Sequence, residues 1–160
     1  MSILIRDIGP ADNAAVERLI RDCLIEFGAD HEGTAWADPD LGRFSEVYST
    51  EGSRYWVAEA DGEIVCGAGI GKLTEDLCEL QKMYCRKDFR GSGAARLLME
   101  KALDYAKGFY RRCCLETLDN MTAAQRFYEK YGFERIGELP VKTGHFACQV
   151  RYIRDLTETR

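Results

Sequence analysis

The sequence predicts an α/β protein with a mixed, mostly antiparallel central sheet and helices on both faces. Three strand-like segments follow one another at residues 55–59, 64–72 and 77–85, and successive strands joined by short turns pair antiparallel. Helix-like and strand-like segments then alternate up to residue 153, which is typical of a sheet covered by helices. A chain of 160 residues is long enough to bury a core as one domain, residues 1–160.

The segments before the three strands have clear periodicities. Alternating isoleucines predict a first strand over residues 2–8. Apolar residues then recur at every third or fourth position, which predicts an amphipathic helix over residues 12–27. Gly28 follows as a plausible C-cap. Apolar residues in the segment 41–48 predict a short second helix.

Turn residues divide the three central strands. Asp61-Gly62 is a hairpin signal. Gly67, Gly69 and Gly71 occupy alternate positions of the next strand, which indicates a bulge or the close approach of a ligand or another chain segment.

The second half of the chain continues the alternation. Helices are predicted over residues 93–107 and 123–131, and strands over 112–118, 133–136 and 145–153. The predicted order is therefore β-α-α-β-β-β-α-β-α-β-β.

The turn between the third central strand and the next helix is built from small residues. Arg90 is followed by Gly91, Ser92, Gly93, Ala94 and Ala95. The free N–H groups of a first helical turn bind anions, and glycines let a phosphate approach the backbone. Arg90 adds a bidentate cation. The turn therefore predicts a pyrophosphate site, and it is not a P-loop, because no lysine follows Gly93.

Two motifs resemble a known family. Arg90, Gly93 and Ala95 match the R-x-x-G-x-A form of the signature of the GNAT superfamily of acyl-CoA-dependent N-acyltransferases. The segment NMTAAQRFYEKYGF, residues 120–133, resembles a second hallmark of that superfamily. The element order resembles the GNAT fold along nearly all of the chain.

The resemblance implies roles for several residues in binding acetyl-CoA. Met83 and Cys85 would pair through their main chain with the pantetheine arm, and residues 90–95 would hold the pyrophosphate. Asn120 is either a pantetheine-binding residue or a helix cap, since it lies one position further from Tyr128 than the family spacing.

The reaction needs an acid and a base. Tyr128 matches the family tyrosine that bonds the coenzyme sulfur, with Tyr131 as its rival. Glu79 lies six residues before Cys85, where some members of the superfamily place a glutamate that acts as a base through water.

Three predicted strands contribute candidate residues around the acceptor amine. Strand alternation places Glu79 on one face with Gln81, Met83 and Cys85. Glu116 is the alternative base, and His145, which begins the last predicted strand, is a candidate for the acceptor pocket.

Composition narrows the function classes. A net charge of −5 argues against nonspecific nucleic-acid binding. No segment has the ~18 consecutive apolar residues that a membrane span requires. The seven cysteines have no metal-ligand spacing with the histidines, so no metal is expected. An odd number of cysteines and no secretory N-terminus favour a cytoplasmic location.

The resemblance implies transfer of acetyl from acetyl-CoA to the primary amine of a small molecule by direct attack. Alternatives on the same fold are a protein N-terminal or lysine acetyltransferase and a non-catalytic acyl-CoA-binding sensor. An ATP-binding protein is a third possibility, against which the missing P-loop lysine counts. A homodimer is an expectation from the superfamily alone.

Overall fold

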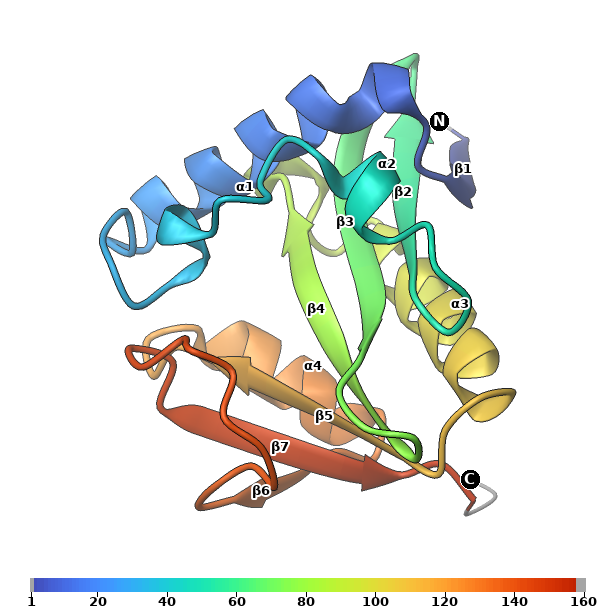
Figure 1. Cartoon of the computed structure of the whole chain (residues 1–160). Coiled ribbons are helices and arrows are strands. Elements are labelled where there is room, and N and C mark those ends of the chain that lie inside the picture. The colour runs from blue at the N-terminus through green and yellow to red at the C-terminus, as the bar shows by residue number, and fades with distance from the viewer. Residues whose placement is uncertain (1, 158–160) are drawn as a thin grey trace.

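The computed structural model describes residues 2–157 and has one mixed sheet (Figure 1). Its strands are β1 (Ile3–Asp7), β2 (Arg54–Ala60), β3 (Glu63–Lys72), β4 (Leu77–Cys85), β5 (Arg112–Thr117), β6 (Glu134–Ile136) and β7 (Val150–Asp155). They form a seven-stranded sheet in the order β1-β2-β3-β4-β5-β7-β6. Only the β4–β5 pair is parallel. The predicted fold class is therefore confirmed.

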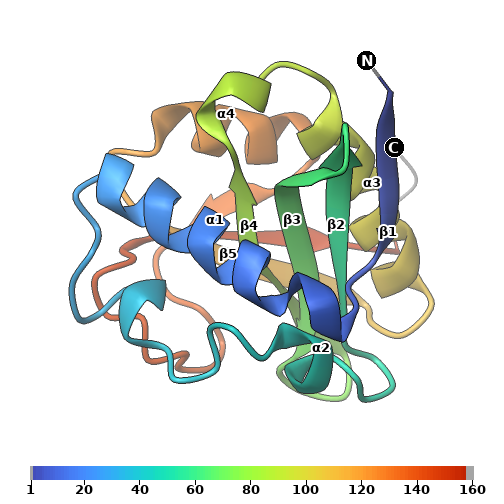
Figure 2. The same ribbon diagram turned by 90° about the horizontal axis from the view of Figure 1, so that it is seen from above.

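Helices cover both faces of the sheet. They are α1 (Asn13–Glu26), α2 (Phe44–Val47), α3 (Ala94–Lys107) and α4 (Thr122–Lys130), with short 3-10 turns at Pro10–Asp12, Ala35–Ala37 and Lys87–Phe89. The buried apolar stripes of α1 and α2 pack with Tyr55 and Val57 in one core. Those of α3 and α4 pack with Trp56 and Tyr152 in the other. Figure 2 shows α1 crossing one face, with α3 and α4 behind the sheet.

The sheet opens between β4 and β5. Their parallel pairing covers only residues 77–79 of β4 and 112–114 of β5. Beyond that point β5 stays paired with β7 along its whole length, and β4 stays paired with β3. Figure 1 shows the two strands diverging, with α4 behind the gap. The last six residues of β4 therefore have a free edge toward β5.

A β-bulge interrupts β4 just where this free edge begins. Gln81 pairs with Gly69 of β3, and the next pair along the strands joins Tyr84 to Gly67, so β4 carries one residue more than β3 between these pairs. Lys82 lies in the bulge with a φ of 51°, in the left-handed region. Such bulges kink and twist a strand.

The bulge corrects the predicted alternation of side chains. Glu79 and Gln81 share one face, where Gln81 bonds Tyr48 in the α1–α2 core. Met83 and Cys85 pack instead against the α3–α4 core. One extra residue reverses the faces of everything after it, so the prediction that all four lie together is wrong.

The glycines of β3 are explained by their neighbours. A Cβ at Gly67 or Gly69 would lie 2.5 Å or 2.6 Å from an atom of the Tyr55 side chain, and one at Gly71 would lie 2.4 Å from Gln81. These positions therefore accept close approach by protein side chains. Of the alternatives left open by the sequence, two are observed: close approach of the chain itself, and a bulge, since the β3–β4 register shifts between Gly67 and Gly69.

The last strand begins five residues later than predicted. It begins at Val150, and residues 145–149, including Cys148, are loop. Gly144 has a φ of 85°, and the Ala147 amide bonds the Gly33 carbonyl at 3.0 Å. His145 reaches Asp38. These contacts hold the segment against the chain after α1 and keep it out of the sheet.

Candidate active site

A cleft of about 340 Å³ lies where β4 separates from β5. Its walls come from the end of β4, the turn that precedes α3, the C-terminal part of α1 and the face of α4. It brings together seven residues singled out in the sequence: Met83, Cys85, Arg90, Gly91, Ala95, Asn120 and Tyr128. Ser92, Gly93 and Ala94 are not among its lining residues.

The main chain of β4 offers polar groups to this cleft. The Arg86 amide donates to the Val65 carbonyl at 2.8 Å, so the next antiparallel pair, Cys85 with Cys66, is a non-hydrogen-bonded pair. The amide and carbonyl of Cys85 therefore point away from β3, toward the open edge. The carbonyl accepts a hydrogen bond from Arg90 Nε at 3.1 Å.

The turn before α3 holds two glycines in the left-handed region. Gly91 has a φ of 79°, and Gly93, the N-cap of α3, has a φ of 96°. Ser92 Oγ accepts a hydrogen bond from the Ala94 amide at 3.3 Å. Within residues 2–157, the amides of Gly91, Gly93 and Ala95 have no hydrogen-bond acceptor. Free amides and the positive end of a helix dipole favour an anion at such a position.

Arg90 is held by α1 in this structure. Its Nη1 and Nη2 atoms bond the two carboxylate oxygens of Glu26 at 2.6 Å and 2.7 Å, and its guanidinium lies 5.4 Å from the ring centroid of Phe27. The hydrogen bond from Arg90 lowers the pKa of Glu26. Arg90 must therefore exchange a carboxylate partner before it can bind a phosphate bidentately.

Tyr128 separates two hollows. It lines the cleft and also an inner cavity of about 50 Å³ beside it. Its side chain is buried, which raises its pKa. Tyr131, its rival, packs on Phe127 with ring centroids 5.0 Å apart and does not line the cleft.

Asn120 does not cap α4. The N-cap of that helix is Met121, which makes no side-chain capping bond. Asn120 Nδ2 donates instead to the Phe27 carbonyl at 2.9 Å, at the end of α1. The amide side chain thus joins α1 to the start of α4 across one side of the cleft.

The inner cavity has two charged lining residues, Lys82 and Glu116. Their side chains are 12% and 6% exposed. Glu116 also lines an outer hollow of about 560 Å³ formed mainly by residues 137–146. Glu116 therefore lies between an opening to the outside and the cavity that contains Tyr128.

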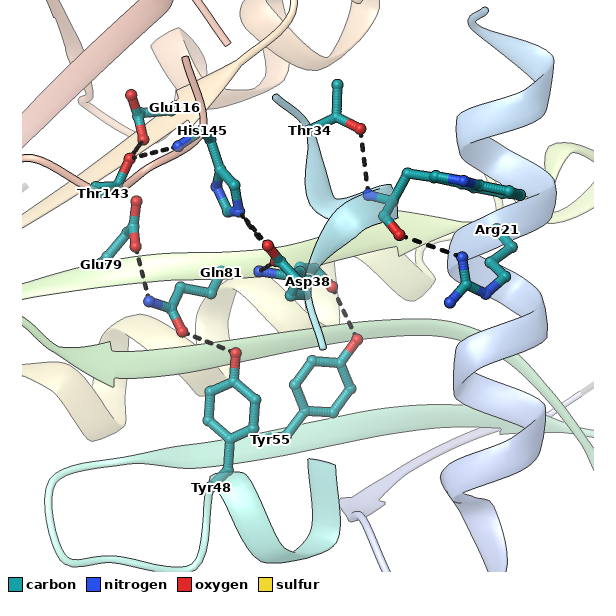
Figure 3. Close-up of polar contacts among 12 residues, drawn as sticks. Arg21, Thr34, Asp38, Tyr48, Tyr55, Glu79, Gln81, Glu116, Thr143 and His145 are labelled. Atoms are coloured by element: carbon teal, nitrogen blue, oxygen red, sulfur yellow. Dashed lines mark hydrogen bonds and ion pairs between the residues drawn. The ribbon is translucent and has the colours of Figure 1, made fainter. Parts of the chain in front are cut away.

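Glu79 lies deeper and lines none of these hollows. It is 6% exposed and accepts a hydrogen bond from Gln81 Nε2 at 2.7 Å. Gln81 in turn accepts one from the Tyr48 hydroxyl at 2.7 Å (Figure 3). Burial raises the pKa of Glu79, as does the charge of Glu116, against the opposing effect of the Gln81 bond.

Glu116 is held by the loop before β7. The Thr143 hydroxyl donates to its carboxylate (Figure 3), and Arg151 Nε lies 3.5 Å from its second oxygen. The structure thus brings both candidate bases to one side of the sheet opening, and only Glu116 borders the cavity beside Tyr128.

Asp38 completes the polar cluster and was missed by the sequence analysis. It bonds His145 Nε2 at 2.9 Å and Lys82 Nζ at 2.7 Å. Burial opposes ionisation of Asp38, but these two partners outweigh it and lower the pKa. The Tyr55 hydroxyl fixes the bulge by donating to the Lys82 carbonyl at 2.8 Å. His145 therefore does face this cluster, although from a loop.

Residues 2–157 contain no group of three or more His, Cys, Asp or Glu side chains that could hold a metal ion. Within the same range, every helix is too short or too polar to cross a membrane.

Sequence comparison finds relatives along the chain. The family model described as "Acetyltransferase (GNAT) domain" matches residues 51–135. The Escherichia coli (strain K12) protein "Uncharacterized N-acetyltransferase YjgM" is 41% identical over 160 residues, covering 97% of this chain and 96% of that protein. Human "N-acetylaspartate synthetase" is 36% identical over 127 residues, covering 72% of this chain and 42% of that protein.

Structural comparison finds the same architecture. A GNAT-family acetyltransferase from Staphylococcus aureus Mu50 has a TM-score of 0.86 at 25% identity, covering 98% of this chain and all of that one. The acetyltransferase yncA from Salmonella typhimurium, solved with its cofactor acetyl-CoA, has a TM-score of 0.74 at 20% identity, covering 100% of this chain and 97% of that one.

Proposed function

The chain belongs to the GNAT family of acetyl-CoA-dependent acetyltransferases, and on that premise we propose that it acetylates the primary amine of a small molecule. The observation that carries the proposal is the position of Tyr128, whose ring borders both the cleft at the sheet opening and the inner cavity. A thioester in the cleft and an amine in the cavity would meet at this residue.

The coenzyme would occupy the cleft. Met83 and Cys85 would pair with the pantetheine arm through the free edge of β4, and Asn120 would face it from the other side. The residues Arg90, Gly91, Ser92, Gly93, Ala94 and Ala95 would hold the pyrophosphate. The unsatisfied amides of this turn support that assignment.

Tyr128 would protonate the departing thiolate. A phenol is a credible donor to a thiolate because the pKa values of the two groups are similar. Burial raises the pKa of Tyr128, which keeps the hydroxyl protonated before the transfer but makes it a weaker acid than an exposed phenol.

The base would come from the pair Glu79 and Glu116. The cavity favours Glu116 as the carboxylate that meets the amine, because Glu116 borders the cavity and Glu79 does not. Glu79 would then act through water. Its raised pKa makes the Glu79 carboxylate a stronger base than an exposed glutamate.

A small acceptor is favoured by the size of the inner cavity, about 50 Å³. The name of the human relative also supports it, because N-acetylaspartate is an acetylated small molecule. A protein terminus or lysine would have to reach Tyr128 through the loop formed by residues 137–146.

A thiol-release assay with acetyl-CoA tests the proposal directly. The assay would compare small primary amines and amino acids with peptides that carry a free N-terminus or a lysine. Turnover confined to small amines supports the proposal. Turnover confined to peptides would show that the acceptor is a peptide and not a small molecule. Binding of acetyl-CoA without turnover on any amine would favour a non-catalytic sensor.

A further inference from the structure

Three thiols converge on the wall of the cleft at the sheet opening. Cys85 lies on β4, Cys66 lies opposite it on β3, and Cys23 lies on α1, and all three line the cleft. Cys66 and Cys23 are buried, while Cys85 is partly exposed. The acetyl transfer proposed above uses none of these thiols.

The register brings Cys66 and Cys85 to disulfide distance. They are direct Cα partners on adjacent antiparallel strands, and the Arg86–Val65 hydrogen bond makes theirs a non-hydrogen-bonded pair. Such pairs have Cα atoms about 4.5 Å apart with side chains on the same face. Disulfides need Cα separations of about 4.4–6.8 Å, so the two thiols can join without a change of strand pairing.

The surroundings make Cys85 the reactive member. The hydrogen bond from the Cys66 thiol lowers the pKa of Cys85, and the nearby Arg90 guanidinium adds to this effect against burial. The same hydrogen bond and burial raise the pKa of Cys66. A thiolate is the nucleophile in thiol chemistry, and of the two paired cysteines only Cys85 has both partial exposure and a neighbouring cation.

We propose that Cys66 and Cys85 form a redox-active pair that closes to a cross-strand disulfide when the protein meets a hydroperoxide. The Cys85 thiolate attacks one peroxide oxygen, the O–O bond breaks, and the released hydroxide takes up a proton as water. The Cys66 thiol then attacks the resulting sulfenic acid of Cys85, the S–S bond forms, and a second water leaves. Two thiols lose two electrons, and one hydrogen peroxide becomes two waters.

The chain contains a matched control for this pair. Cys78 and Cys113 are also direct Cα partners, across the parallel β4–β5 pair. Both are 0% exposed and line none of the described hollows. Because Cys78 and Cys113 are paired but do not line the cleft, their thiols should stay reduced.

Hydrogen peroxide titration followed by thiol alkylation and peptide mass spectrometry tests the pair. The expected product is one disulfide joining Cys66 to Cys85, reversible by dithiothreitol, with Cys78 and Cys113 alkylated. In Cys66→Ala, Cys85 should stop at a sulfenic acid that dimedone traps. Cys113→Ala is the control and should form the disulfide at the wild-type rate. A wild-type protein in which Cys85 remains a thiol, or pairs with another cysteine, overturns the proposal even if the variants fold poorly.

Protection by acetyl-CoA, which carries no free thiol, tests the location separately. Saturating acetyl-CoA should slow disulfide formation several-fold because the coenzyme would cover Cys85. Disulfide formation at an unchanged rate, with acetyl-CoA binding verified by calorimetry, would overturn the placement of the pair in the coenzyme wall. Neither measurement depends on acetyl transfer to any amine. A failure of the proposed acetyltransferase function is therefore distinguishable from a failure of the proposed cysteine pair.

Discussion

Glu26 should weaken coenzyme binding, although it touches no part of the proposed reaction. It bonds both terminal nitrogens of Arg90, the guanidinium assigned to the pyrophosphate. A diphosphate must displace this carboxylate. The binding free energy of the coenzyme is therefore less favourable by the free energy of the Arg90–Glu26 ion pair. Glu26→Gln should therefore tighten acetyl-CoA binding.

The exposure of the pair sets the size of the effect. The Arg90 and Glu26 side chains are 36% and 29% exposed, and ion pairs near the surface contribute about 0.2–1 kcal/mol. A gain of ~0.5–1 kcal/mol corresponds to a dissociation constant roughly 2–5 times lower. Isothermal titration calorimetry with acetyl-CoA at low salt measures this range directly.

Glu17→Gln is the matched control. Glu17 also lies on α1 and bonds an arginine, Arg21, at 2.9 Å, but neither residue lines the cleft. Its affinity for acetyl-CoA should equal that of the wild type. An affinity of Glu26→Gln that is unchanged or lower, with the control at the wild-type value, would refute the competition between Glu26 and the diphosphate.

Four further outcomes are expected. Tyr128→Phe should lower kcat by about 100-fold or more with little change in acetyl-CoA affinity. An unchanged kcat would show that Tyr128 is not the general acid. Glu116→Gln should lower kcat/KM for the amine more than Glu79→Gln does, as read from pH–rate profiles; the reverse order would return the main role to Glu79. Burial raises the pKa of Glu79, so its stabilising effect is complete below the unfolded pKa of about 4.3 and is lost as pH rises through the folded pKa. The Tm of Glu79→Gln should therefore gain on the wild type from pH 4 to pH 8, and a constant difference would contradict this. Gly69→Ala should lower stability by about 1–3 kcal/mol in urea unfolding, because its Cβ would meet the Tyr55 ring; wild-type stability would show that the ring moves aside.

The parts of the fold that follow from local patterns were predicted well. The amphipathic stripe of α1 and the Asp61-Gly62 turn depend on neighbours in the sequence, and both are present. The turn at residues 90–95 was also recognisable, because small residues and one arginine stand together. The assignment of this turn to pyrophosphate stays a prediction.

The parts that depend on distant contacts were not predictable. An extra residue at Lys82 leaves no mark on the alternation of β4, yet it reverses the side chains after it. The start of the last strand was wrong because the contacts of His145 with Asp38, 107 positions away, hold the segment in a loop. The proposed acceptor side draws on residues from the segments on either side of α2, from β4, from β5 and from the last loop, and no single stretch of sequence contains them.

The short pairing between β4 and β5 would also make the stability of the sheet depend on the coenzyme. Only residues 77–79 of β4 pair with β5. A pantetheine arm lying along the free edge would add hydrogen bonds to β4 where β5 makes none. A ligand that binds only the folded chain adds RT ln(1 + [L]/Kd) to its stability. Removal of acetyl-CoA would therefore lower the free energy of unfolding of the protein.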